Sequence, residues 1–401
     1  METHDVIVVG GGPAGSSCAR VLARGGARVV VVDRAVFPRV KLCAGWISAP
    51  LWDVLELAPR EYPAGLWPWD TCHVHYRGRG HAIACRGWFI RRYELDDHLL
   101  RTSGAELRLG LSVKEIDRDA DGLWNVAGLR ARHLVGAGGT HCPVARVVAP
   151  PRRAGPVGVQ ELEFPLDPAA IARARAGRDG EPELLLHDDL RGYAWNVPKT
   201  DWINIGVGTL DPTEVRAAWG RARDHFRGAG HVPDGAEDAL EHVKGHSYYL
   251  YDPVHLDGAA RIDADGKGGV FLAGDALGLA QPMTAEGILP AALSGRVLAE
   301  ALLDGEPEAY PARLAAHPVL ADYRRLHGLR DTVAGLRRRR APAAGARPRG
   351  LAADGAVGRL AERAAARAVA TGFAWMFSGA RLPAPRLVDR ALDVLTRRRS
   401  P

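Results

Sequence analysis

The stretch from Asp5 to Asp33 most constrains the fold, because it reads as a strand, a glycine turn, an alanine-rich helix and a second strand. In such a turn Gly10 permits the sharp bend, Gly12 lets the backbone approach a pyrophosphate, and Gly15 lets the helix lie close to the strand. The helix N-terminus then presents unpaired N–H groups to the phosphates. Asp33 can accept hydrogen bonds from both ribose hydroxyls and would repel a 2′-phosphate. The segment therefore predicts a site for FAD or NAD rather than NADP.

Length and cysteine usage predict a multidomain protein of the cytoplasm. The 401 residues predict two packed domains with an appendage. The first strand leaves no room for a signal peptide, and no apolar run is long enough to span a bilayer.

The five cysteines are widely spaced with no C-x-x-C pair, which argues against a disulfide framework or a zinc site. His73 and His75 would share one face of a strand, but no third ligand is evident, so we expect no metal site.

The net charge of +6 is unevenly distributed along the chain. Residues 328–401 contain sixteen arginines, no lysine and five acidic residues, which leaves the rest of the chain mildly acidic. A nucleic-acid partner is not expected, because the body lacks a basic groove with interleaved aromatic side chains. Two interpretations of the basic region remain. It forms either a helical cap packed on the body or an amphipathic surface that makes peripheral contact with an anionic membrane.

A second Gly-Asp element favours FAD over NAD. The apolar run that starts at Gly268 ends in Gly274 and Asp275. An enclosed FAD needs such a second contact for its ribityl chain, and Gly287 with Ile288 opens a helix whose dipole can stabilise a reduced flavin. The alternative is an ordinary strand and turn in which the aspartate caps a helix.

The expected fold class is α/β, a Rossmann-type FAD-binding domain with an inserted antiparallel-sheet substrate domain and a helical C-terminal region. The FAD-binding domain comprises residues 1–142 and 245–327, with 46–85 contributing partly to the substrate side. Residues 143–244 form the substrate-binding sheet, and residues 328–401 form the basic helical region.

Five ordered motifs carry a family resemblance. They are VVGGGPAG, PRVKLCAGW, RRYELDDHLL, GYAWNVPK followed by INIGVG, and FLAGDALGLAQPMTAEGI. Together they resemble the geranylgeranyl reductase family within the p-hydroxybenzoate hydroxylase superfamily of flavoproteins, over roughly residues 3 to 305. The resemblance implies bound FAD, with Tyr193 and Trp195 lining the substrate cavity. Two aromatic residues at i and i+2 on a strand project to one face, although ordinary sheet-core packing would produce the same pattern.

The predicted site combines the motifs with the resemblance. The cofactor contacts are Gly10, Gly12, Pro13, Ala14, Gly15, Asp33, Arg34, Cys43, Ala44, Gly45, Arg92, Gly274, Asp275, Gly287 and Ile288. Cys43 is the candidate catalytic residue, because a thiol beside a reduced flavin can act as a general acid. The alternative is a buried structural cysteine.

Departures from the family pattern affect the substrate and the electron donor. Trp46 stands where the reductases have a small residue, and Val197 replaces the final Phe of the Y-x-W-x-F-P signature, so the pocket is expected to be altered. The Asp-Gly motif linked to nicotinamide use appears without its aspartate in the run from Gly136 to Cys142. The donor is left open between NAD(P)H and a reduced carrier protein, and the oligomeric state is also left open.

The expected activity is FAD-dependent reduction of C=C bonds in an apolar small molecule, prenyl or related. The first alternative is a flavin-dependent monooxygenase or halogenase acting on an aromatic substrate. A further alternative is a non-catalytic flavin-binding membrane adaptor, in which the basic C-terminal region would be the working part.

Overall fold

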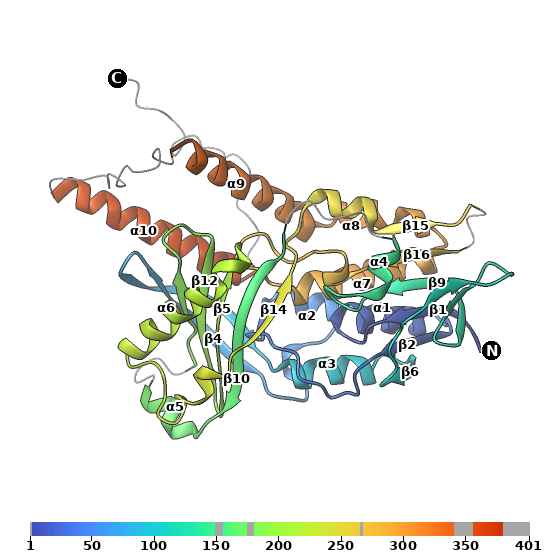
Figure 1. Cartoon of the computed structure of the whole chain (residues 1–401), viewed down its shortest axis with the longest axis horizontal. Coiled ribbons are helices and arrows are strands. Elements are labelled where there is room, and N and C mark those ends of the chain that lie inside the picture. Colours follow the sequence, from blue (N-terminus) through green and yellow to red (C-terminus); the bar gives the residue numbers. More distant parts are fainter. Residues whose placement is uncertain (1, 149–154, 175–179, 265–267, 341–355, 380–401) are drawn as a thin grey trace.

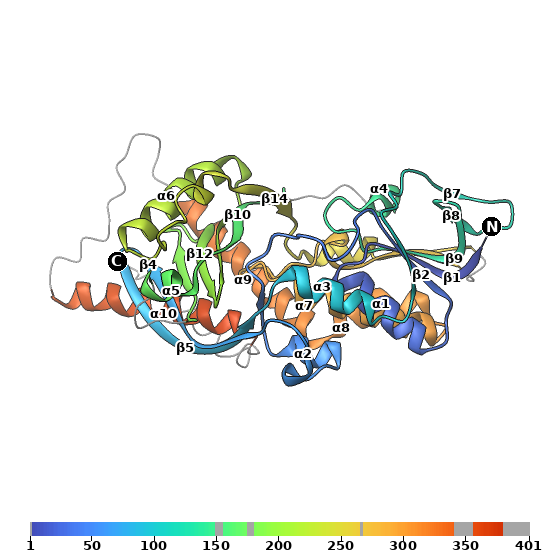
Figure 2. The same cartoon turned by 90° about the horizontal axis from the view of Figure 1, so that it is seen from below.

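The computed structural model describes residues 2–148, 155–174, 180–264, 268–340 and 356–379, with the backbone alone at 331–340 and 356–365. Two sheets lie side by side along the long axis, each with its own helices (Figures 1 and 2). Among the described residues, no helix combines the length and the apolar character needed to cross a membrane.

The first sheet, sheet A, has the strand order β15-β16-β9-β1-β2-β6. Its strands are β1 (Thr3–Val9), β2 (Val29–Asp33), β6 (Glu106–Leu109), β7 (Ile116–Arg118), β8 (Trp124–Val126), β9 (Leu129–Gly136), β15 (Ala260–Ile262) and β16 (Gly269–Leu272). The pairs among β16, β9, β1, β2 and β6 are all parallel, and the β7–β8 hairpin extends from β9. β1 and β2 are continuous apolar runs because both faces of a parallel sheet are covered.

The second sheet, sheet B, has the order β14-β10-β13-β12-β11-β4-β5-β3. Its strands are β3 (Trp46–Ile47), β4 (Trp67–Tyr76), β5 (Arg79–Phe89), β10 (Val157–Pro165), β11 (Glu183–Leu186), β12 (Gly192–Lys199), β13 (Trp202–Thr209) and β14 (Lys244–Tyr248). All neighbours are antiparallel except β4 and β11. Sheet B therefore collects strands from three separated parts of the chain.

The helices divide between the two sheets. They are α1 (Pro13–Arg24), α2 (Pro50–Leu55), α3 (Arg92–Arg101), α4 (Pro143–Val148), α5 (Pro168–Ala174), α6 (Val215–Gly228), α7 (Ile288–Leu303), α8 (Tyr310–Ala316), α9 (Pro318–Arg340) and α10 (Ala356–Phe377). α6 and α10 cover opposite faces of sheet B (Figure 2). On the α6 face, Trp219 and Phe226 pack against Ile205 and Val207, whereas Phe373 of α10 packs on the other face.

The sheets divide the chain at residues slightly different from those expected. β3, β4 and β5 all belong to sheet B, whereas α2, which lies between β3 and β4, packs against α7. The expected boundary at 245 falls inside β14, which pairs with β10. α4 lies beyond the expected boundary at 143, yet its Val144 joins the core of sheet A. Strand pairing decides these boundaries, and pairing partners are not visible in local sequence.

Candidate functional site

A cavity of about 710 Å³ extends between the two sheets, from the end of β1 to β12 and the last turn of α10. Most of the predicted site residues line it. These are Gly10, Gly12, Pro13, Ala14, Asp33, Arg34, Cys43, Ala44, Trp46, Arg92, Tyr193, Trp195, Asp275, Gly287 and Ile288. The volume is in the range typical of small-molecule and cofactor sites.

Gly15, Gly45 and Gly274 are not among the residues that line this cavity, although Gly15 has the close helix–strand packing that the sequence predicts for it. A Cβ on Gly15 would lie 1.8 Å from the carbonyl oxygen of Gly10, and a Cβ on Gly45 would lie 1.8 Å from that of Ile90. Gly45 also has a φ of +72°, a conformation that other residues rarely adopt. We assign these glycines a packing role, which lets neighbouring residues such as Cys43 and Ala44 reach the cavity.

The glycine turn forms a cradle open to the cavity. Gly10 has a φ of +115°, and a Cβ there would lie 2.4 Å from the Ala137 oxygen. Gly12 has more space around it than Gly10, because the nearest atom to a Cβ at this position is Nη2 of Arg39, at 3.5 Å. Gly12 is also the N-cap of α1 and provides no side-chain cap. The first turn of α1 therefore presents backbone N–H groups to the cavity, an arrangement that suits a phosphate.

Asp33 is oriented by the backbone around it. Its Oδ2 accepts a hydrogen bond from the N–H of Gly11 at 2.7 Å, and its Oδ1 accepts one from Ala35 at 2.8 Å. A carboxylate has about four lone-pair sites, so two remain for ribose hydroxyls. Asp33 also lines the cavity, and its contact with a ribose stays a prediction.

Two arginines share one buried carboxylate beside the cradle. Arg92 donates from Nε and Nη2 to Asp96 at 2.6 and 2.7 Å, and Nη2 of Arg39 lies 3.1 Å from the same carboxylate. Burial disfavours the charge on Arg92, but Asp96 outweighs burial and raises the pKa of Arg92. Arg92 and Arg39 are therefore held in place at the cavity wall, where cations suit a diphosphate. Sequence reasoning missed Arg39, although it is a basic residue in the loop before Cys43.

A second helix begins at the cavity. α7 starts after Gly287, which provides no side-chain cap, and Oδ1 of Asp275 lies 3.4 Å from the position of a Cβ on Gly287. Glu286 accepts a hydrogen bond from Ser48 at 2.9 Å, and burial raises the pKa of Glu286 to about 7. Two uncapped helix N-termini, two arginines and the Asp33 carboxylate line one cavity. This donor and acceptor set fits FAD.

Aromatic side chains form the substrate end. The rings of Tyr193 and Trp195 lie 5.8 Å apart, and the Tyr193 hydroxyl donates to the Thr284 carbonyl. Trp46 and Phe377 lie with ring centroids 4.4 Å apart, and Nε1 of Trp46 donates to the Phe377 carbonyl at 3.1 Å. The last turn of α10 therefore closes this end of the cavity. Trp46 and Phe377, which meet there, are 331 positions apart in the chain.

Two candidate acids face the aromatic end. Cys43 accepts a hydrogen bond from the Gly45 N–H at Sγ, and burial raises the pKa of its thiol. Glu161 on β10 is 1% exposed, and its Oε2 has no hydrogen-bond partner among the described residues. Burial raises the pKa of Glu161 to about 7, and Nδ1 of His246 lies 3.5 Å from its Oε1. Glu161 is therefore partly protonated near neutral pH.

Glu161 was missed by sequence reasoning although a signal exists. Val157, Val159 and Glu161 alternate along one strand and so project to the same face. A carboxylate in phase with buried valines is unusual unless it has a partner or a function. The partner, His246, comes from β14, which is more than eighty residues away in the sequence.

Three comparisons with known proteins bear on this site. Residues 3–49 match a family model described as an FAD binding domain. The chain is 28% identical over 354 residues to the menaquinone reductase of Mycolicibacterium smegmatis, covering 79% of this chain and 82% of the relative. It is 28% identical over 337 residues to the chloroplastic geranylgeranyl diphosphate reductase of Oryza sativa subsp. japonica, covering 75% and 66%. This chain is an FAD-dependent oxidoreductase.

The oxidoreductase is related to the geranylgeranyl and menaquinone reductases. Its fold also resembles the crystal structure of Pseudomonas aeruginosa PqsL in complex with 2-aminobenzoylacetate. That likeness has a TM-score of 0.58 at 22% identity and covers 82% of this chain and 100% of that chain. At this level of identity the likeness shows a shared fold.

The C-terminal region of the oxidoreductase packs on sheet B over its last described turns. Phe373 and Phe377 are buried in the same apolar core as Trp69 and Trp195. Membrane contact through this region stays a prediction, and residues 380–401 of the basic region lie outside the described residues.

Proposed function

We propose that this oxidoreductase reduces carbon–carbon double bonds of an apolar, prenyl-type substrate. The observation that carries the proposal is the aromatic end of the cavity, where four aromatic rings line a cavity that a buried carboxyl group also lines. Those rings belong to Trp46, Tyr193, Trp195 and Phe377. The names of the related menaquinone and geranylgeranyl diphosphate reductases support a prenylated or prenyl substrate.

The residues of the chain would bind the cofactor and the substrate and would exclude water from the cavity. Gly12 and the first turn of α1 receive the phosphates, Asp33 receives the ribose, and Arg92 with Arg39 balances the phosphate charge. At the other end, the apolar rings provide surface for an alkene and displace water from it. Reduced FAD, when bound, supplies a hydride equivalent, so saturation of the alkene requires one proton from another source.

We assign that proton to Glu161, with Cys43 as the competing donor. Both face the same cavity, but they differ in acidity. Glu161, with a pKa of about 7, is a better acid at neutral pH than a thiol whose pKa burial raises. His246 lies 3.5 Å from Glu161. Burial lowers the pKa of His246 to about 3, so this imidazole is neutral and does not compete as a cation.

Anaerobic single-turnover kinetics test the proposal. The purified flavoprotein is reduced with dithionite, and the flavin absorbance is followed on addition of a polyprenyl alkene or, separately, of oxygen with an aromatic compound. We expect reoxidation by the alkene without oxygen, with a saturated product detected by mass spectrometry. Oxygenated or halogenated aromatic product with no alkene turnover would overturn the reductase assignment and favour the monooxygenase or halogenase alternative. Purified protein that takes up no FAD would overturn both.

A further inference from the structure

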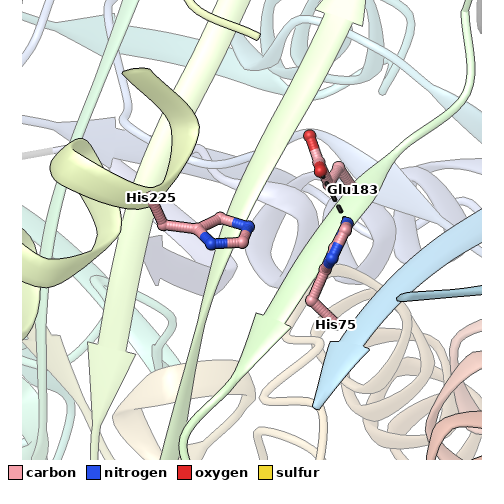
Figure 3. Close-up of side chains that lie close together, drawn as sticks. All are labelled: His75, Glu183 and His225. Carbon is pink, nitrogen blue, oxygen red and sulfur yellow. Dashed lines mark ion pairs between the residues drawn. The ribbon is translucent and has the colours of Figure 1, made fainter. Parts of the chain in front are cut away.

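A second cluster of titratable side chains lies on the other face of sheet B, beneath α6. His75 comes from β4, Glu183 from the neighbouring strand β11, and His225 from α6 (Figure 3). β4 and β11 are parallel, and the register pairs Glu183 with His73 and Leu185 with His75. Side chains two positions apart on paired strands share a face, so Glu183 and His75 both project toward α6.

The three side chains converge on one point. Nε2 of His75 lies 2.7 Å from Oε1 of Glu183, and the rings of His75 and His225 lie 5.0 Å apart. One ligand atom from each of the three residues lies within 4.8 Å of the other two. Figure 3 shows the His225 ring extending from α6 toward the pair formed by His75 and Glu183. The Glu183 side chain is fully buried, whereas that of His75 is 21% exposed.

Hydrogen bonding within the described residues leaves two of these nitrogens unsatisfied. Nε2 of His225 and Nε2 of His75 are buried atoms without a hydrogen-bond partner, despite the short distance from His75 to Glu183. Buried polar atoms are almost always satisfied in folded proteins, by protein groups, water or an ion.

We propose that His75, Glu183 and His225 form a site for one divalent transition-metal ion, with Zn²⁺ as the best match. Two imidazole nitrogens and one carboxylate oxygen are ligands that Zn²⁺ prefers, and a solvent molecule can take the fourth position because His75 is partly exposed. Ligand atoms around a tetrahedral Zn²⁺ stand about 3.3 Å apart, so binding requires only a small separation of His75 and Glu183.

His231 completes the environment as a positioning residue. Its Nδ1 lies 2.7 Å from Oε2 of Glu183 and 2.9 Å from Oε1, the oxygen that faces His75. Outer partners of this kind hold a ligand carboxylate in one orientation. The site lies on the α6 face, whereas the FAD cavity lies on the α10 face, so the ion would join α6 to β4 and β11 without touching the substrate.

Metal stoichiometry on the full-length flavoprotein tests the proposal. The protein is treated with a chelator, equilibrated with Zn²⁺, desalted and measured by inductively coupled plasma mass spectrometry. We expect one equivalent of Zn²⁺ in the wild type and its loss in His75→Ala and in His225→Ala. His4→Ala is the matched control, because it removes a histidine from the other candidate cluster, which contains Glu2 and Glu106. This variant should retain the full equivalent.

A second readout separates loss of metal from loss of folding. Zn²⁺ should raise the Tm of the wild type and of His4→Ala, whereas the Tm of folded His225→Ala should not respond. Co²⁺ in place of Zn²⁺ should give visible absorption typical of a tetrahedral site in the wild type and in His4→Ala but not in His225→Ala. A wild type that retains no Zn²⁺, or one whose stoichiometry is unchanged by both His75→Ala and His225→Ala, would overturn the proposal. Neither readout depends on alkene reduction.

Discussion

The two ends of the cavity are built in different ways. The nucleotide end is formed chiefly by one contiguous segment, in which Gly10, Gly12 and Asp33 lie within 24 positions of one another. The substrate end combines side chains from β3, β10, β12 and the last turn of α10, and its Trp46 and Phe377 are 331 positions apart. Backbone geometry recognises the dinucleotide, whereas converging side chains recognise the substrate. We expect substitutions at the substrate end to affect turnover and stability without removing FAD. Substitutions at the nucleotide end should weaken FAD binding and leave turnover at saturating FAD nearly unchanged.

The largest effect is expected for the proton donor. Glu161→Gln removes the proton and keeps the shape of the side chain, so alkene reduction should slow by roughly 100- to 10,000-fold. FAD content should be unchanged, because Glu161 lies at the substrate end. Single-turnover rates of flavin reoxidation measure the effect, and Cys43→Ser is the matched control. If Cys43→Ser abolishes the reaction and Glu161→Gln leaves it intact, Cys43 is the donor.

Phe377→Ala should produce the next largest effect, through stability. Phe377 is 5% exposed and packs against Trp46 and Tyr193. Truncating a buried phenylalanine costs about 3–5 kcal/mol in free energy of unfolding. Urea denaturation measures this cost, and Phe377→Leu should show a smaller loss. FAD should remain bound in the folded fraction. Release of FAD without any loss of stability would contradict the division between the two ends.

The free energy of unfolding should depend on pH because the buried carboxyl group of Glu161 titrates. The pKa of Glu161 rises to about 7 in the fold, so its contribution to stability is present below its ordinary pKa and is lost as the pH rises through about 7. Glu161→Gln should match the wild type at pH 4 or below and exceed it above pH 8 by up to about 3 kcal/mol. The charged or titratable groups around Glu161 are Lys41, Glu163, Lys199 and His246. Urea denaturation of the cofactor-free protein across this range measures the difference, and a difference independent of pH would exclude titration of Glu161 as its cause.

The smallest of these effects is expected at Asp33. Asp33→Asn removes a charged acceptor for the ribose hydroxyls, and a hydrogen bond to a charged group contributes about 1.5–3 kcal/mol. FAD affinity should therefore fall by roughly 10- to 100-fold, as measured by fluorescence titration. Turnover at saturating FAD should stay close to that of the wild type. The control is Asp97→Asn, since Asp97 pairs with Arg101 on the outer side of α3. An equal loss of affinity in both variants would point to a general effect of charge.

The sequence predicted more of the nucleotide end than of the substrate end. Asp33 and Arg92 line the cavity as expected, and so do Tyr193 and Trp195, which the family signature indicated. Sequence reasoning missed Arg39 and Glu161. Each residue has a local sequence signal, but its role can be recognised only when the residues that surround it in the fold are known. His75 of β4 shows the same difficulty, because its neighbours Glu183 and His225 come from β11 and α6 rather than from nearby sequence.

By itself, the sequence determined the parallel sheet, the glycine turn and the FAD cofactor. These features depend on backbone conformation within a few consecutive residues, and the chemistry of those residues is readable in order. Only the tertiary structure decided which helix closes the substrate end, which acid faces it, and which residues meet beneath α6. Those features depend on contacts between strands and helices that are distant in the sequence, and such contacts arise from packing of the whole chain.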